Sequence, residues 1–305
     1  MKVLIFGSNG LVGSSLYRNM KKDIFYSEVI PSTRKDANLF SFEETKSLIE
    51  KINPDLIINA AARVGGIVAN NTNRIEFIIE NLKINTNILE SLIKFPNIKL
   101  INLGSSCIYP LNAENPIKEN SLMTGKLEPT NSPYAMAKLT AIEMGNSLSI
   151  QHGHKIANLM PTNLYGPNDN FSEINSHVIP GLIARMHSAK INNLDKFEVW
   201  GTGTPMREFL HVDDLCSAID FLIKNNKYPK LINVGSGDEI SIKHLVEKIK
   251  NIIDYKGEIF FNHDMPDGNP RKLLDSSVMN SLGWKSSINL DEGLKSTYEW
   301  YKKNN

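Results

Sequence analysis

A glycine-rich turn directly after the first apolar run constrains the fold more than any other feature. KVLIF at residues 2–6 leads into GSNGLVG, in which Gly7, Gly10 and Gly13 recur every three residues. Glycines at this spacing allow a tight turn from strand to helix and let the backbone approach a pyrophosphate closely. A plain glycine-rich turn is the alternative, but the position behind a strand favours a dinucleotide site.

The first half of the chain alternates short apolar runs with amphipathic segments. Runs at residues 2–6, 55–60, 99–104 and 156–160 lack polar alternation, as expected for strands covered on both faces. Ser41 and Glu44 stand at capping-box spacing at the start of a predicted helix over 41–52, which Pro54 closes. A second helix is predicted from Pro133 to Gly153. The pattern predicts an α/β protein with a Rossmann-type doubly wound parallel sheet.

Loops rich in glycine and proline become frequent beyond residue 165, in YGPND, WGTGTPM, NVGSGDE and MPDGNP. Loops of this kind are where a substrate site is commonly built. We therefore predict a dinucleotide-binding domain over residues 1–165, to which parts of 200–235 return. Residues 166–305 are predicted to form mainly a smaller α/β lobe that binds the substrate.

Charge and cysteine content narrow the classes of function. With 34 Lys and Arg against 33 Asp and Glu, the net charge of +1 provides no basic field for a nucleic acid. Cys107 and Cys216 are too few for a disulfide framework, and no apolar signal segment precedes the first strand. No window approaches the roughly 18 apolar residues of a membrane helix. We predict a cytoplasmic protein that acts on a small molecule, with no metal site.

A tyrosine and a lysine share one face of the predicted helix after residue 132. SPYAMAKLTA places Tyr134 and Lys138 four residues apart. An ammonium group beside a phenol lowers the phenol pKa from its usual value of about 10, so we expect Tyr134 to serve as an acid or base near neutral pH. In LGSS, Ser105 and Ser106 end the upstream strand, where they can donate a hydrogen bond to the same reacting oxygen. Surface decoration is the alternative for the Tyr and Lys pair.

The end of the second predicted strand bears on the choice of dinucleotide. EVIPSTRK offers Arg34 and Lys35 where an acid would bind the ribose hydroxyl of NAD or a base the 2′-phosphate of NADP. NADP(H) is therefore favoured over NAD(H). The alternative for Arg34 is an ordinary exposed arginine.

Further segments carry a resemblance that covers nearly the whole chain in order. Together with GSNGLVG and the Tyr134/Lys138 pair, the chain resembles the extended short-chain dehydrogenase/reductase superfamily and, within it, the GDP-L-fucose synthase family. The segments are AARVGGIVANN, LGSSCIYP, LEPTNSPYAMAK, LMPTNLYGPNDNF, NSHVIPGL, VWGTGTPMREFLHVDD and PDGNPRKLLD. The resemblance implies an NADPH-dependent conversion of GDP-4-keto-6-deoxy-D-mannose to GDP-L-fucose, by 3,5-epimerisation and 4-keto reduction.

The resemblance assigns roles to five side chains. A ketone at sugar carbon 4 acidifies the hydrogens at carbons 3 and 5, so epimerisation needs a base and an acid. Cys107 matches the base and His177 the acid, while Tyr134 supplies the proton for the reduction. Lys138 would tune Tyr134 and bind the nicotinamide ribose, and Ser105 would hold the oxyanion. Taken alone, Cys107 would be a small buried hydrophobe and His177 a capping or core histidine.

Binding residues follow from the same resemblance. The nucleotide sugar would contact Arg185, Trp200, Arg207, Asp267 and Lys272, because cations suit a diphosphate; salt bridging between the lobes is the alternative for Arg185 and Lys272. NADP(H) would contact Gly7, Ser8, Asn9, Gly10, Leu11, Val12, Gly13, Arg34, Leu103, Gly104, Ser105, Ser106, Lys138, Pro161, Thr162, Asn163, Leu164 and His177. Family members commonly carry an arginine where this chain has Asn9, so we expect a weaker preference for NADP(H) here.

The family also implies a homodimer that packs two helices from each subunit, here residues 72–95 and 133–152. Two other functions stay open. One is a related enzyme of the GDP-colitose synthase kind, which epimerises a 3-deoxy sugar only at carbon 5, and the other is a catalytically silent nucleotide-binding protein on the same fold. The joint presence of Ser105, Cys107, Tyr134, Lys138 and His177 favours an enzyme.

Overall fold

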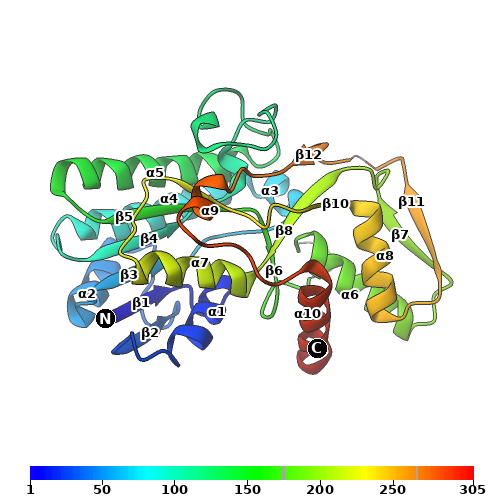
Figure 1. The fold of residues 1–305 in the computed structure, drawn as a ribbon, viewed down its shortest axis with the longest axis horizontal. Coiled ribbons are helices and arrows are strands. Elements are labelled where there is room, and N and C mark those ends of the chain that lie inside the picture. Colours follow the sequence, from blue (N-terminus) through cyan, green and yellow to red (C-terminus); the bar gives the residue numbers. More distant parts are fainter. Residues whose placement is uncertain (173–175, 266) are drawn as a thin grey trace.

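The two parts of the molecule lie side by side in Figure 1, a parallel sheet with helices on both faces and a smaller lobe built on α6, α8 and α10. A computed structural model describes residues 1–172, 176–265 and 267–305 of the chain. Asn175 and Pro266, which belong to motifs quoted above, lie outside the described residues. In Figure 1 the N-terminus lies by the sheet and the C-terminus ends α10 in the smaller lobe.

The larger sheet has six parallel strands in the order β2–β1–β3–β4–β5–β9. The four apolar runs of the sequence are β1, β3, β4 and β5, which confirms the predicted doubly wound sheet. Because the order reverses direction between β1 and β3, a crevice is expected at the carboxyl ends of these strands. The strand bounds are β1 Lys2–Phe6, β2 Glu28–Ser32, β3 Leu56–Asn59, β4 Lys99–Leu103, β5 Ile156–Pro161 and β9 Ile232–Val234.

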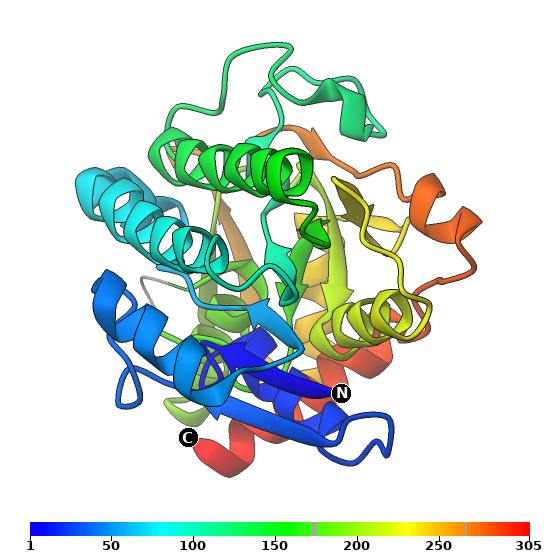
Figure 2. The same ribbon diagram turned by 90° about the vertical axis from the view of Figure 1, so that its left-hand side faces the viewer.

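Helices cover both faces of this sheet, which explains the continuous apolar runs. In β1, Val3 and Ile5 pack toward α1 and α7, whereas Leu4 and Phe6 pack toward α2, α4 and α5. Figure 2 shows α4 and α5 side by side on the outside of the second face. These helices are α1 Leu11–Met20, α2 Phe42–Ile52, α4 Arg74–Leu92, α5 Ser132–His152 and α7 Val212–Lys224.

The ends of α2 and α5 follow the capping signals of the sequence. The Ser41 hydroxyl accepts a hydrogen bond from the Glu44 amide at 3.3 Å. The Glu44 carboxylate turns instead to the Asn38 amide at 2.9 Å, so only one half of the capping box forms. Helix α5 has a proline in its first turn and ends at Gly153, whose positive φ of 74° suits glycine.

The smaller lobe is built around β8 (Met206–His211), which lies between β10 (Glu239–Ser241) and β12 (Arg271–Lys272) and also pairs with β6 (Asn163–Tyr165). Strands β7 (Lys196–Trp200) and β11 (Glu258–Asn262) form a separate parallel pair. The other elements are α3 Ile67–Thr72, α6 Val178–Ile191, α8 Ile242–Ile253, α9 Ser277–Ser281, α10 Leu290–Asn304 and the short 3₁₀ turns η1 Ser106–Ile108 and η2 Glu119–Ser121.

Segments from the second half of the chain also join the larger sheet. Strand β9 is its last strand, and α7 packs on α1 in the same apolar cluster. The domain division at residue 165 stays a prediction. Among the described residues, no helix has the length and apolar character needed to cross a membrane.

A buried carboxylate fixes the loops around β8. The side chain of Glu208 is fully buried, and its two oxygens accept hydrogen bonds from the amides of Gly237 at 2.8 Å and Leu274 at 3.1 Å. Burial raises the pKa of Glu208, while these hydrogen bonds oppose the rise. Glu208 therefore joins β8 to the loops that follow β9 and β12.

We predict that Glu208→Ala lowers the free energy of unfolding by about 2–4 kcal/mol, because the buried amide of Leu274 and the partly buried amide of Gly237 lose their acceptor. Glu239 on β10 lies opposite Glu208 and forms an exposed ion pair with Arg271, so Glu239→Ala is the matched control and should cost less than about 1 kcal/mol. Urea unfolding of both variants measures the two costs. Equal costs would contradict the role given to Glu208.

Candidate active site

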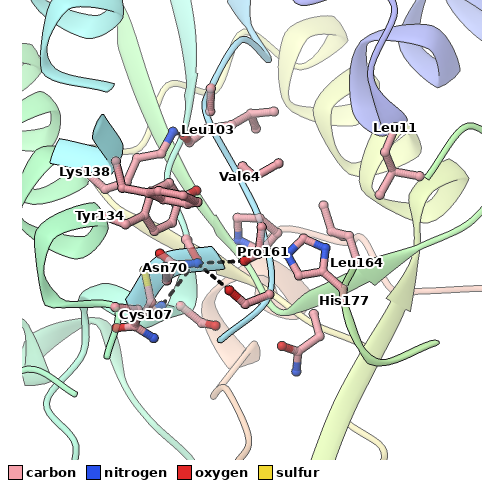
Figure 3. Close-up of a pocket in the computed structure, with 18 of the residues that line it drawn as sticks. Leu11, Val64, Asn70, Leu103, Cys107, Tyr134, Lys138, Pro161, Leu164 and His177 are labelled. Atoms are coloured by element: carbon pink, nitrogen blue, oxygen red, sulfur yellow. Dashed lines mark hydrogen bonds between the residues drawn. The ribbon is translucent and has the colours of Figure 1, made fainter. Parts of the chain in front are cut away.

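A large cavity of about 1510 Å³ lies at the carboxyl ends of the parallel strands. Its wall includes residues that follow β1, β3, β4 and β5, together with side chains of the smaller lobe. Figure 3 shows Cys107, Tyr134, Lys138 and His177 around it. The cavity therefore unites motifs that lie far apart in the sequence.

The glycine turn at one end of the cavity leaves no room for side chains. Gly7 has a φ of +76°, and a Cβ there would lie 2.7 Å from the Cα of Ala61. A Cβ on Gly13 would lie 2.2 Å from the carbonyl oxygen of Gly7. Gly10 is the N-cap of α1 and provides no side-chain cap, so the first amides of α1 stay available to an anion. This geometry fits the pyrophosphate of a dinucleotide.

Most of the predicted cofactor contacts line the cavity. Ser8 and Gly13 stand behind its wall, where the Ser8 hydroxyl donates to the Ser32 carbonyl at 3.0 Å. Arg34 is an exposed residue of the wall, beside Lys35. The wall contains Gly7, Asn9, Gly10, Leu11, Val12, Arg34, Leu103, Gly104, Ser105, Ser106, Lys138, Pro161, Thr162, Asn163, Leu164 and His177.

Tyr134 and Lys138 project from the first turns of α5 into a buried environment. Lys138 donates a hydrogen bond to the Leu103 carbonyl at 2.7 Å, and its Nζ lies 5.6 Å from the centre of the Tyr134 ring. Burial lowers the pKa of Lys138 to about 8, and the nearby Cys107 opposes this shift. The ammonium thus lies by the ring and the Leu103 carbonyl.

The expectation of a lowered Tyr134 pKa is wrong for this structure. Burial raises the pKa of Tyr134, the neighbouring Cys107 raises it further, and a hydrogen bond with Ser105 opposes both effects. The unfavourable transfer of a phenolate from water to this environment outweighs the stabilising hydrogen bond with Ser105. Tyr134 is therefore a protonated phenol at neutral pH, which suits an acid better than a base.

Cys107 lies in the 3₁₀ turn η1, just beyond the end of β4. Its amide donates to the Ser105 hydroxyl at 3.4 Å, and only 7% of the residue is exposed. Burial raises the pKa of the Cys107 thiol, whereas Lys272, Ser105 and Lys138 lower it. Two lysines thus supply the electropositive surroundings that a thiolate needs.

His177 precedes α6 as its N-cap residue, and its ring faces the cavity (Figure 3). The side chain makes no capping hydrogen bond to the helix. His177 is exposed to the cavity, and desolvation by the surrounding protein lowers the pKa of its imidazole, which is therefore neutral at pH 7. The cavity therefore has a titratable group on α6 as well as those on η1 and α5.

Two cations of the smaller lobe also line the cavity. Lys272 on β12 lies in register with Arg207 on β8, so the two residues are neighbours across the sheet. Burial lowers the pKa of both side chains. Asp267 opposes the shift at Arg207, while Cys107 and Glu128 oppose the shift at Lys272 and the charge of Arg207 adds to it. The half-exposed Trp200 and Asp267 also line this side of the cavity. The Asp267 carboxylate accepts hydrogen bonds from the Thr202 hydroxyl at 2.7 Å and the Thr202 amide at 2.9 Å. A half-buried pair of cations suits a diphosphate.

Arg185 lies away from the wall of the cavity. Its guanidinium is 5.5 Å from the ring centre of Phe197 and 6.0 Å from that of Trp200, and it borders a smaller pocket between α6 and β7. Only Trp200 of these neighbours reaches the large cavity. A substrate contact by Arg185 stays a prediction.

Sequence reasoning missed several polar residues of the wall. Asn70, Glu128, Asn131 and Asp169 all line the cavity, and burial raises the pKa of Asp169 to about 7. All four lie within segments quoted for the family resemblance, so the polar residues of those segments could have been proposed as further cavity residues. The separation of the segments along the chain hid their common position.

The lowered pKa of Lys138 predicts a pH dependence of stability. Between pH 8 and about 10.5 the unfolded chain binds a proton at Lys138 that the folded protein has released, so the free energy of unfolding should rise with pH. Compared with Lys138→Met, the wild type should gain up to about 3 kcal/mol across this window. Urea unfolding at a series of pH values measures the difference. Parallel curves for the two proteins would show that Lys138 keeps an ordinary pKa.

Comparisons with known proteins agree with the geometry. Residues 3–235 match the NAD dependent epimerase/dehydratase family. The chain is 46% identical to GDP-L-fucose synthase 1 of Arabidopsis thaliana, over 99% of this chain and 94% of that protein. It is 36% identical to GDP-L-colitose synthase of Yersinia pseudotuberculosis, over 100% of both chains.

A solved structure extends the likeness to three dimensions. The crystal structure of a GDP-L-fucose synthetase from Naegleria fowleri bound to NADP is 28% identical and superimposes with a TM-score of 0.91, over 99% of this chain and 92% of that one. The family match, the full-length identity and the shared fold all support the resemblance seen in the sequence motifs. The chain belongs to the NAD dependent epimerase/dehydratase family and, within it, to the GDP-L-fucose synthase family.

Proposed function

We propose that the protein converts GDP-4-keto-6-deoxy-D-mannose to GDP-L-fucose, by epimerisation at carbons 3 and 5 and then reduction of the carbon 4 ketone with NADPH. The observation that carries the proposal is that one cavity collects Cys107, His177, Tyr134 and Lys138. The higher identity to a GDP-L-fucose synthase than to a GDP-L-colitose synthase favours the substrate with a carbon 3 hydroxyl.

The glycine turn and the wall beyond it would hold NADPH. The pyrophosphate would face the first amides of α1, and Arg34 would meet the 2′-phosphate. The nicotinamide end would lie toward Lys138 and Asn163. When bound, NADPH supplies a hydride for the carbon 4 ketone.

Cys107 and His177 would carry out the epimerisations. A Cys107 thiolate takes the proton from carbon 3 or 5, the electron pair moves onto the carbon 4 oxygen as an enolate, and the His177 imidazolium returns a proton to the opposite face. Lys272 and Lys138 favour the thiolate. The thiolate and the substrate diphosphate, both negative, favour the protonated imidazole. Both groups then exchange protons with water before the second inversion.

Tyr134 would act in the reduction as the acid. Its raised pKa keeps the phenol protonated, so it can donate its proton to the carbon 4 oxygen as negative charge develops there. Ser105, at the end of β4, would donate a second hydrogen bond to the same oxygen. Lys138 would bind the nicotinamide ribose and carry positive charge beside Tyr134.

The smaller lobe would bind the GDP moiety. Arg207 and Lys272 offer two adjacent cations to the diphosphate, and Trp200 offers a half-exposed ring to the nucleoside. Arg185 lies by Trp200 and would complete this end. We also propose a cytoplasmic location, because both cysteines are free and the role of Cys107 requires a reduced thiol.

The proposal is tested by incubating the protein with GDP-4-keto-6-deoxy-D-mannose in deuterated water, with NADPH or NADH. We expect cofactor oxidation and GDP-L-fucose with deuterium at carbons 3 and 5, both detected by NMR. A faster reaction with NADPH than with NADH would show that Arg34 is sufficient to select the 2′-phosphate although position 9 is an asparagine. Deuterium at carbon 5 alone, with preference for a 3-deoxy substrate, would indicate the GDP-colitose type of enzyme. No turnover would indicate a silent protein.

Two variants separate the steps of this same reaction. Cys107→Ser should lower deuterium incorporation by about 10²–10⁴-fold while cofactor oxidation continues, because only the epimerisation base is lost. Tyr134→Phe should lower cofactor oxidation by a similar factor but deuterium incorporation much less, because Ser105 still donates to the enolate oxygen. If Cys107→Ser incorporates deuterium at the wild-type rate, the thiol is not the base.

We further propose that two copies of the chain pack together through α4 and α5. The two helices lie side by side on the outside of the sheet (Figure 2), and they expose Ile75, Ile79 and Met136 with exposed fractions of 60%, 43% and 47%. Covering these side chains would remove apolar surface from water.

Light scattering on the wild type should therefore give twice the mass of one chain. Ile79→Glu should shift the protein toward one chain, because it places a charge in the contact. Ile24→Glu is the matched control, since Ile24 is fully exposed in the loop between α1 and β2 and should leave the mass unchanged. A wild type with the mass of one chain would overturn the proposed dimer.

A further inference from the structure

Asn70 has an amide whose orientation is fixed by two carbonyl groups. It lies on the short helix α3, and its Nδ2 donates to the Gly65 carbonyl at 2.7 Å and the Gly66 carbonyl at 3.0 Å. Because a carbonyl oxygen can only accept, the end of the amide that faces Gly65 and Gly66 must be the NH₂ group. The other end is therefore the oxygen, a hydrogen-bond acceptor.

This oxygen is buried without a partner among the described residues. Asn70 is 7% exposed, lines the large cavity, and its Oδ1 accepts no hydrogen bond. Buried polar atoms are nearly always paired, so an acceptor left open at a cavity wall indicates a donor that comes with a ligand. No role in the proposed reaction uses this atom.

The position of Asn70 in the cavity bears on the kind of donor. Figure 3 shows Asn70 on the same side of the view as Cys107 and Tyr134, apart from Leu11 of the glycine turn. Cys107 and Tyr134 are the groups that act on the sugar ring in the proposed reaction. The keto-sugar offers O–H donors on carbons 2 and 3, whereas its ketone and diphosphate offer only acceptors.

We propose that Asn70 Oδ1 accepts a hydrogen bond from the carbon 2 or carbon 3 hydroxyl of the substrate and so positions the ring against Cys107. The inference rests on the proposed function and adds a specificity residue to it. A site built to bind a hydroxyl discriminates strongly against a substrate that lacks it, because the buried acceptor is then left unpaired. Asn70 would thereby contribute to the choice between hydroxylated and deoxygenated hexoses.

The test removes the Asn70 acceptor and the substrate hydroxyl, first separately and then together. Wild type and Asn70→Leu are assayed with GDP-4-keto-6-deoxy-D-mannose and with its 2-deoxy and 3-deoxy analogues, and kcat/KM is measured for each combination. Asn73→Leu is the matched control, because Asn73 also donates to a backbone carbonyl, that of Ala69 at 3.1 Å, but does not line the cavity. Asn70→Ala repeats the measurement without the apolar bulk of leucine.

We expect Asn70→Leu to lower kcat/KM for the full substrate by roughly tenfold or more, with the KM for NADPH unchanged. In the wild type, one of the two analogues should lose activity by a similar factor. The same analogue should react with Asn70→Leu almost as well as the full substrate does, and this loss of discrimination is what a merely structural role would not produce. Asn73→Leu should keep the wild-type discrimination.

Three results would overturn the inference. In the first, each analogue loses as much kcat/KM relative to the full substrate with Asn70→Leu and Asn70→Ala as it does with the wild type. This result would mean that Asn70 binds neither hydroxyl. The second is a raised KM for NADPH with unchanged discrimination, which would assign the acceptor to the cofactor. The third is a wild type that does not turn over the full substrate, in which case the proposed function fails first and the inference falls with it.

Discussion

The buried carboxylate of Glu208 determines how the two halves of the cavity meet. It holds the amides of Gly237 and Leu274, and so fixes the loops after β9 and β12 against β8. The neighbouring positions on β8 and β12 carry Arg207 and Lys272, the two cations that line the cavity. A carboxylate without these amides would be costly to bury, so the loops must close for the strand to be stable. The same contact that stabilises the lobe therefore sets the position of its cations.

Burial also decides the chemistry of the groups that face the cavity. It raises the pKa of Tyr134 and Cys107 and lowers that of Lys138 and His177, so each group rests in its neutral form more readily than in water. A neutral phenol is the form that donates a proton in the proposed reduction. A neutral thiol and a neutral imidazole are not the forms that epimerise, and the proposed mechanism therefore depends on the charges of the lysines and of the substrate itself.

The parts of the site that depend on local sequence could be predicted, and the parts that depend on how distant segments meet could not. Periodicity and the glycine spacing were enough for the strands, and the motif around Tyr134 for its helix. The environment of Tyr134 was not available from spacing: two residues four apart share a helix face, but burial and the neighbouring Cys107 raise the pKa of Tyr134 more than the hydrogen bond with Ser105 lowers it. Asn70 was visible in a motif, yet only its fixed amide and open oxygen distinguish it from other asparagines.

One oxygen atom of the sugar links the two proposed reactions. Epimerisation places negative charge on the carbon 4 oxygen as an enolate, and reduction places it on the same atom as an alkoxide, so one set of donors serves both. Ser105 and Tyr134 line the cavity beside Cys107, where a ring held for proton removal at carbon 3 or 5 keeps carbon 4 in reach of these donors. A second site for the reduction would require release of a reactive ketone. A single cavity avoids that release, provided that the ring is held firmly while its configuration changes at two carbons.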